Sequence, residues 1–198
     1  DILITSDAGR LVRAEDAGVL LAGTSPELEA AVTAHLRSPQ GYWYGLSVRA
    51  RALVYNLADV NPDTLSTYEA LAQPQWRGRI CVRSSSNIYN QSLVASMLAT
   101  QGAAKTAVWL DGLVANFARP PQGGDRDQIK AVAAGLCDVA IVNSYYLGGM
   151  MTSNNEAERT AASKVGIFWP NQNDRGTHVN ISGAGVTAAS DQPELAVQ

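Results

Sequence analysis

The sequence predicts an α/β fold of two lobes, and three observations support that prediction. Short apolar runs alternate along the chain with amphipathic stretches, which is the order of strands and helices in α/β proteins. Segment 46–55 is long for one strand and carries two arginines among apolar residues, so it could cross between lobes. A second crossing is expected near 165–169, before Pro170 breaks the extended run. A ligand cleft between the lobes would follow.

The strands are expected where apolar residues run together. The first lies at the very start of the chain. Those at 80–83 and 139–142 are short apolar runs of the kind that parallel sheets bury. The predicted extended segments are 2–5, 46–55, 80–83, 139–142, 165–169 and 177–184.

The helices are expected where small or polar residues open an amphipathic stretch. The stretch 90–100 runs through Leu93 and Met97 at helical spacing, and the last two helices end near Asn116 and Gly135, as caps predict. The predicted helices are 9–17, 26–34, 67–72, 90–100, 103–116 and 125–134. The predicted domains are 1–50 as part of lobe 1, 51–165 as lobe 2, and 166–198 as the return to lobe 1.

Composition excludes several classes of protein. With 198 residues, 46% hydrophobic and 17% charged, the chain can bury a core and is neither disordered nor fibrous. A net charge of -3 and scattered basic residues argue against nucleic acid as a partner. No apolar stretch is long enough to span a membrane. Because the chain starts within a strand, without Met or a signal peptide, we expect a fragment.

Two cysteines leave two interpretations open. Cys81 and Cys137 each lie in an apolar run and are too far apart in sequence for a Cys-x-x-Cys site. Buried free thiols and a disulfide in an oxidising compartment are equally compatible with the sequence. Zinc is disfavoured, because His35 and His178 do not stand at finger spacing from the cysteines.

A polar loop between the strand 80–83 and the next helix has the layout of an anion site. Ser84, Ser85, Ser86 and Asn87 supply hydroxyl and amide groups where backbone amides and the positive end of the helix dipole would meet a ligand. Taken alone, the loop is more simply a helix N-cap with additional serines.

Three tyrosines point to chemistry at the carboxyl ends of two strands. Tyr145 and Tyr146 directly follow the run 139–142, and Tyr89 lies in the loop after 80–83. If both strands belong to one parallel sheet, the three phenols converge. A phenol has a pKa near 10, so only a strongly charged partner such as ferric iron would ionise it at neutral pH. The alternatives are tyrosines that cap the core and an aromatic platform for a sugar or amine.

Several stretches resemble the ferric-iron-binding periplasmic proteins of bacterial ABC transporters, and the resemblance covers essentially the whole chain. It looks closest to the cyanobacterial type. Such proteins have the type II periplasmic-binding-protein fold, shared with transferrin lobes, with two lobes, a hinge and an interlobe cleft. The stretches that carry the resemblance are 83–93, 116–119, 124–135, 142–148 and 177–186.

The resemblance implies a function and a set of site residues. It implies a protein, not an enzyme, that captures Fe(3+) in the periplasm and delivers it to an ABC permease as a monomer. By position, Tyr89, Tyr145 and Tyr146 match iron-binding tyrosines. The residues implied at the cleft or at a synergistic anion such as carbonate are Ser84, Ser85, Asn87, Asn143 and, from the other lobe, Arg10.

The sequence departs from the family's pattern at two points, and two other functions are considered. The family's further histidine or tyrosine ligand would lie before Asp1, and where some members place a glutamate this chain has Ser6 and Asp7. The same fold could instead bind a small anion or a polyamine. A serine hydrolase using the 84–86 loop is the second rival, but no base is evident. The carboxylates of Asp125 and Asp127 are interpreted as helix caps.

Overall fold

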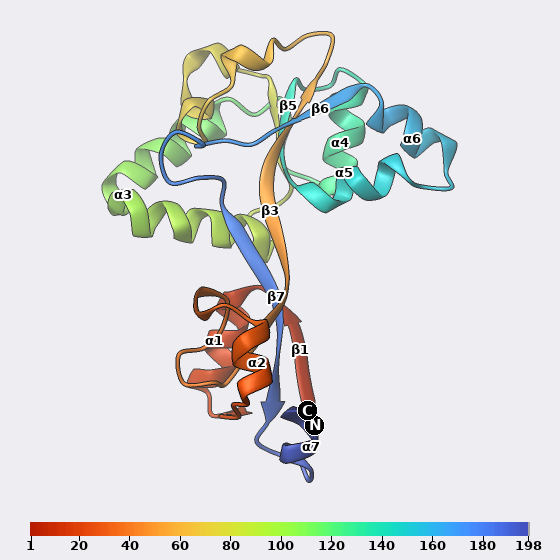
Figure 1. Ribbon diagram of the computed structural model, residues 1–198. Coiled ribbons are helices and arrows are strands. Elements are labelled where there is room, and N and C mark those ends of the chain that lie inside the picture. The colour runs from red at the N-terminus through yellow and green to blue at the C-terminus, as the bar shows by residue number, and fades with distance from the viewer. Residues whose placement is uncertain (198) are drawn as a thin grey trace. The chain divides into compact units, whose positions relative to one another are not determined.

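The computed structural model describes residues 1–197, which divide into two compact units (Figure 1). Unit 1 consists of residues Asp1–Arg49 and the segment from Val179 onward, and unit 2 is Ala50–His178. The chain therefore leaves unit 1 within β3 (Tyr44–Asn56) and returns to it at β7 (Val179–Thr187). The sequence predicts that the chain passes from one lobe to the other after residues 50 and 165. That assignment of residues to lobes stays a prediction.

Unit 1 is built on an antiparallel sheet centred on β7. The strand β1 (Ile2–Ser6) pairs with β7 in the register Ile2 to Val186, β2 (Leu20–Leu21) also pairs with β7, and the first part of β3 lies beside it. The helices are α1 (Ala8–Asp16), α2 (Pro26–Ala31), the 3-10 turn Ala34–Leu36 and α7 (Pro193–Val197). Leu11, Leu20, Trp43 and Ile181 form the buried core between these elements.

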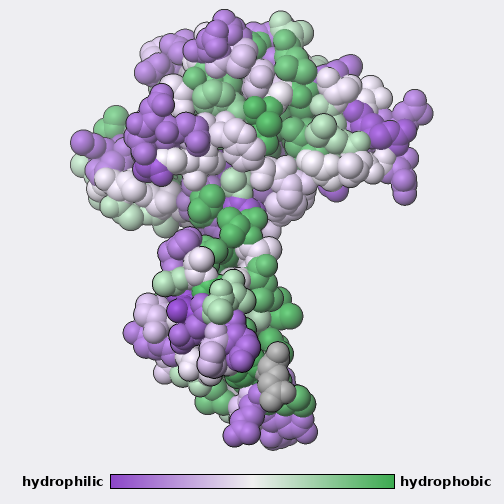
Figure 2. Space-filling view, viewed as in Figure 1, coloured by the Kyte–Doolittle hydropathy of each residue, from purple (hydrophilic) through white to green (hydrophobic). Residues whose placement is uncertain are grey.

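Part of the apolar surface of unit 1 stays exposed. Figure 2 shows a band of hydrophobic residues along β1, where Ile2 and Ile4 are 48% and 68% exposed. Alternation along the strand turns Leu3 toward the core instead. The strand β1 therefore leaves the apolar side chains of Ile2 and Ile4 in solvent.

Unit 2 is a mixed sheet with helices on both faces. The strand β3 pairs antiparallel with β5 (Val139–Asn143) and β6 (Val165–Phe168), while β4 (Ile80–Cys81) pairs parallel with β5. This confirms the predicted parallel pairing of 80–83 with 139–142. The remaining elements are α3 (Ile88–Ala115), α4 (Asp125–Ala133), α5 (Ser144–Met151), α6 (Glu156–Ala162) and the 3-10 turns Pro62–Thr64, Glu69–Ala72 and Pro74–Trp76.

The central strand β5 is buried on both faces, which explains its unbroken apolar sequence. Val139 and Ile141 point into the core beneath α3, whereas Ala140 and Val142 point into the core beneath α4 and α5. Figure 1 shows these helices on opposite sides of the sheet. A strand covered on both faces needs apolar residues at every position.

The structure confirms the break between the helices predicted at 90–100 and 103–116, because α3 consists of two helices that meet in a kink at Gly102, whose φ of 81° and ψ of 167° lie outside the helical region. It departs from the predicted elements in two other places. The helix predicted at 67–72 is the 3-10 turn Glu69–Ala72. The two tyrosines predicted at a strand end open α5, which the prediction missed because Gly148 and Gly149 lower its helix propensity.

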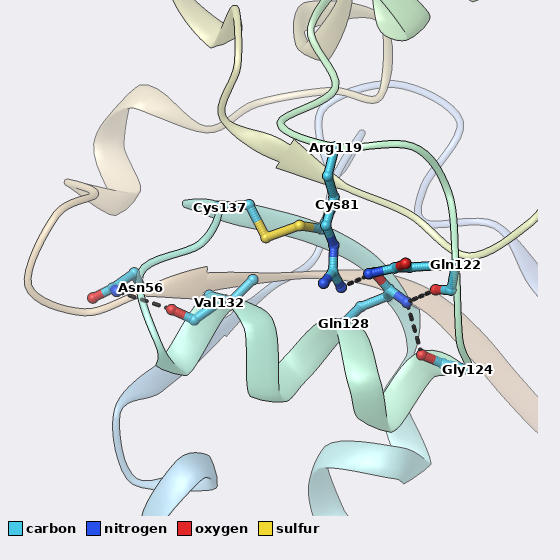
Figure 3. The surroundings of a disulfide bond; sticks show 8 residues. All are labelled: Asn56, Cys81, Arg119, Gln122, Gly124, Gln128, Val132 and Cys137. Carbon is cyan, nitrogen blue, oxygen red and sulfur yellow. Dashed lines mark hydrogen bonds between the residues drawn. A yellow bond between two sulfur atoms is a disulfide. The ribbon is translucent and has the colours of Figure 1, made fainter.

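Cys81 and Cys137 form a disulfide, which settles the question that the sequence left open. Their Cα atoms lie 5.8 Å apart, and the bond joins β4 to the residues before β5 (Figure 3). Beside it, the Gln128 side chain of α4 accepts from Arg119 at 3.2 Å and donates to the carbonyl of Gly124 at 3.0 Å. The disulfide therefore ties together the two parallel strands that lead to the predicted tyrosine cluster.

Candidate metal centre

The three predicted tyrosines come together in unit 2. Tyr89 lies in the first turn of α3, and Tyr145 and Tyr146 lie in the first turn of α5. Both helices follow the carboxyl ends of the parallel neighbours β4 and β5. The phenol oxygens of Tyr145 and Tyr89 are 3.5 Å apart, and the ring centroids of Tyr145 and Tyr146 are 4.3 Å apart. The phenols thus form one cluster, as the parallel pairing predicted.

The cluster is accessible to solvent from one side. Tyr145 is 46% exposed, whereas Tyr89 and Tyr146 are half-buried. The backbone amide of Tyr89 donates to the Asn87 side chain at 2.9 Å, which caps the start of α3. An ion arriving from solvent could therefore reach the exposed phenol of Tyr145 beside a capped helix start.

Burial, followed by the neighbouring phenols of Tyr146 and Tyr89, raises the pKa of Tyr145 above its ordinary value. The Asn143 side chain acts in the opposite direction and lowers that pKa. Without a cation, the Tyr145 phenol is therefore protonated at neutral pH. Ionisation of Tyr145 therefore requires positive charge near its oxygen.

The serine loop predicted as an anion site is ordered by its own hydrogen bonds. The hydroxyls of Ser84 and Ser86 lie 2.9 Å apart, and Ser84 also accepts from the Ser86 amide at 3.2 Å. The carbonyl of Ser85 accepts from Gln91 at 3.3 Å, and the Ser85 side chain is exposed. The loop lies directly before Tyr89, so any ligand there would adjoin the tyrosine cluster.

Behind the tyrosines lies a buried ionic network that the sequence analysis missed. Arg51 of β3 donates to Asp125 at 2.6 Å, to Asn90 at 2.5 Å and to Asn143 at 3.3 Å. Asp125 also accepts from Arg83 at 3.2 Å. The signal in the sequence was Arg51 itself, since an arginine within an apolar strand needs a buried partner. Burial lowers the pKa of Arg51, and the charge of Asp125 opposes that shift.

The structure also places three other polar residues that the sequence analysis considered, and the role of Arg10 at the cleft stays a prediction. Arg10 belongs to unit 1, is exposed on α1 and donates to Ser6 at 3.3 Å. The backbone of His178 donates to the Tyr68 phenol at 3.2 Å and accepts from the Arg51 amide at 2.9 Å, as expected of a structural position. His35 is exposed in a 3-10 turn.

Two features are absent from residues 1–197. In this range no group of three or more His, Cys, Asp and Glu residues is arranged to hold a metal ion. Across the same residues, no helix is both long and apolar enough to cross a membrane.

The chain is similar to known proteins along its full length. A family model described as bacterial extracellular solute-binding protein matches residues 1–197. The chain is 49% identical to iron uptake protein A1 and 52% identical to iron uptake protein A2, both of Synechocystis sp.. These matches cover all of this chain but only 55% and 58% of the two relatives, so it spans little more than half their length.

Solved structures show the same similarity in three dimensions. The chain matches an IdiA (FutA) protein of Trichodesmium in complex with iron and citrate ligands, with a TM-score of 0.96 and 52% identity over 100% of this chain and 62% of that one. It matches apo FutA2 of Synechocystis with a TM-score of 0.95 and 52% identity over 100% of this chain and 63% of that one. The mixed α/β fold is thereby confirmed as the type II fold of periplasmic ferric-binding proteins.

Proposed function

Because the chain belongs to the bacterial extracellular solute-binding proteins, we propose that it captures ferric iron through Tyr89, Tyr145 and Tyr146. The observation that carries the proposal is the convergence of these three phenols at the ends of two parallel strands. The names of the Synechocystis relatives and the iron in the Trichodesmium complex agree with it.

The chemistry of the donors favours Fe(3+). Ferric iron is a hard trivalent cation and prefers anionic oxygen to sulfur or imidazole. Phenolate oxygens meet that preference and cancel the charge of the metal. The iron would supply the positive charge that ionisation of Tyr145 needs, and each bound phenol would release a proton.

A synergistic anion such as carbonate is part of the proposal. Its binding atoms would come from Ser84, Ser85 and Asn87 in the loop before Tyr89, with Asn143 beside the tyrosine pair. The loop adjoins the cluster, and the first turn of α3 favours negative charge there. The citrate in the Trichodesmium complex supports the idea that an anion accompanies iron in this family.

The biological setting is proposed from the family and from the disulfide. An extracellular solute-binding protein of this family would hand its cargo to an ABC permease, and the place of capture would be the periplasm. The disulfide between Cys81 and Cys137 suits such an oxidising compartment. Transport of iron by a monomer, rather than catalysis, is the role we propose.

A visible titration of the purified protein with ferric citrate tests the proposal. A phenolate-to-iron charge-transfer band should appear and saturate at about one iron per chain. Tyr145→Phe or Tyr146→Phe should abolish or strongly weaken the band, since each removes a ligand oxygen. Tyr55→Phe is the matched control, because Tyr55 lies in the core of unit 2. A full band in both site variants would reject the ligand assignment.

A further inference from the structure

The carboxylate of Asp125 has no exposed atoms and does not serve as a helix cap. Asp125 is the first residue of α4, and its side chain is 0% exposed. The capping bond of α4 is made by Asp127, whose side chain accepts from the Gly124 amide at 2.7 Å. Asp127 therefore makes the cap expected at this helix start, whereas the Asp125 carboxylate, although it lies in the first turn of α4, bonds to other elements, as a buried carboxylate must.

Asp125 bonds to both segments that carry the tyrosines. One carboxylate oxygen accepts from Arg83 at 3.2 Å, and the other accepts from the Asn143 amide at 2.8 Å and from Arg51 at 2.6 Å. Arg83 precedes the serine loop, and its guanidinium lies 5.5 Å from the centre of the Tyr89 ring. Asn143 is the residue from which α5 starts, two positions before Tyr145.

Arg51 adds a second connection between the same two segments. It donates to Asn90, the neighbour of Tyr89, and to the side chain of Asn143. Asn90 in turn donates to the carbonyl of Arg83 at 2.8 Å. The start of α3 and the start of α5 are therefore bonded to one buried ion pair, although they are not adjacent in sequence.

We propose that Asp125 is the positioning residue of the tyrosine cluster, holding Tyr89 in register with Tyr145 and Tyr146 before iron arrives. The proposal rests on the proposed iron function but concerns a residue outside the proposed ligand set, since Asp125 bonds to Arg51, Arg83 and Asn143. Preformed spacing of the oxygens lowers the ordering cost of metal binding and slows release of the metal.

The test compares Asp125→Asn with Asp127→Asn. Both replace a carboxylate by an amide in the first turn of α4, but only Asp125 is bonded to the tyrosine segments. Iron release to a competing chelator should become about 10-fold to 100-fold faster in Asp125→Asn, and the charge-transfer maximum should shift. Asp127→Asn should change neither quantity. Unchanged release and an unchanged maximum in Asp125→Asn would overturn the proposal.

A second variant covers the possibility that Asp125→Asn does not fold. Arg83→Met keeps the buried pair of Arg51 and Asp125 and removes the bond of Arg83 to Asp125 together with the contact to Tyr89. Its iron release should be about 10-fold faster, and its loss of stability should be smaller than that of Asp125→Asn, because the Asp125 carboxylate still pairs with Arg51. A release rate within about twofold of the unsubstituted protein would contradict the positioning role.

An iron-free measurement separates this inference from the proposed function. Fluorine NMR of protein containing meta-fluorotyrosine reports the ring environments of the cluster without metal. Asp125→Asn and Arg83→Met should each shift the Tyr89 signal, and Asp127→Asn should not. The absence of a charge-transfer band in the unsubstituted protein would reject the proposed iron function. The fluorine spectra would still show whether Asp125 positions the tyrosines. Unshifted spectra would reject the positioning role even where iron binds.

Discussion

Arg51 and Asp125 form an ion pair with 2.6 Å between Nη1 and Oδ2, and their side chains are 1% and 0% exposed. Arg126 and Glu158 have the same separation of 2.6 Å, but their side chains are 41% and 13% exposed. The two ion pairs have the same separation, but only the pair of Arg51 and Asp125 is fully buried. A buried charge that loses its partner is far more costly than an exposed one, so the two pairs should respond very differently to substitution.

Arg51→Met should lower the free energy of unfolding by about 3–5 kcal/mol, because it leaves the Asp125 carboxylate buried without its main partner. Arg126→Met should lower it by no more than about 1 kcal/mol. Urea denaturation of both variants gives the comparison. Equal losses in the two variants would show that burial does not control the strength of the pair.

Iron affinity should fall as the pH falls. Each phenol that binds as phenolate releases a proton, so protons compete with the metal, and the raised pKa of Tyr145 strengthens that competition. Competition against citrate at several pH values measures the slope of log affinity against pH. Removal of one ligand in Tyr145→Phe should reduce this slope by about one. Tyr55→Phe should keep it, and an affinity independent of pH would rule out phenolate binding.

Reduction of the disulfide should destabilise the protein by about 4 kcal/mol, the loop-closure contribution for cysteines separated by 56 residues. Chemical denaturation with and without a thiol reductant checks this. The double variant Cys81→Ser with Cys137→Ser is the control, since it should already show the lower stability and should not respond to reductant. A response of the double variant would mean that the reductant acts elsewhere.

Glu69 should contribute stability that is lost in acid. Its carboxylate lies 2.6 Å from Arg175 and accepts from Asn171 at 3.1 Å. Burial raises the pKa of Glu69, but the bonds from Asn171 and Arg175 outweigh it, so the net shift is downward. The stabilisation is present above the unfolded pKa and disappears as the pH falls through the lower folded pKa.

Glu69→Gln should therefore reduce stability at neutral pH by up to about 1 kcal/mol and flatten the decline of stability in acid. Melting temperatures measured from neutral pH to pH about 3 test this. Glu29→Gln is the matched control, because the pair of Glu29 with Arg37 spans 3.9 Å and Glu29 is 52% exposed. Identical pH profiles for Glu69→Gln and the unsubstituted protein would contradict the prediction.

Gly102→Ala should destabilise unit 2 by about 1–2 kcal/mol, since its φ of 81° is unfavourable for a residue with Cβ although no atom lies within 4 Å of the added carbon. Gly148→Ala in α5 meets equally open space at a helical position. That control should be neutral or stabilising by up to about 1 kcal/mol. Thermal unfolding of both variants distinguishes backbone strain from packing, and a stabilised Gly102→Ala would show that the kink in α3 is not strained.

The sequence predicts the fold class and, if the strands at 80–83 and 139–142 share a parallel sheet, the convergence of the tyrosines. Apolar runs at 80–83 and 139–142 marked two buried strands, and a parallel pair brings the residues after both strands to one edge. Tyr89, Tyr145 and Tyr146 could be placed together on that ground alone. The helical start of α5 could not, because Gly148 and Gly149 weaken the local helix signal that tertiary packing of Leu147 and Met150 restores.

Which polar groups lie next to the cluster, and whether the cysteines pair, depends on contacts between segments that are far apart in the sequence. Arg51 and Asp125 are 74 residues apart, and Cys81 and Cys137 are 56 apart. Propensity and periodicity act between residues a few positions apart, so they determine helices, strands and the face on which a side chain lies. The partner of a buried charge or thiol is the group that lies next to it across the folded sheet. The free-energy cost of leaving Asp125 buried and unpaired arises only once the core has formed.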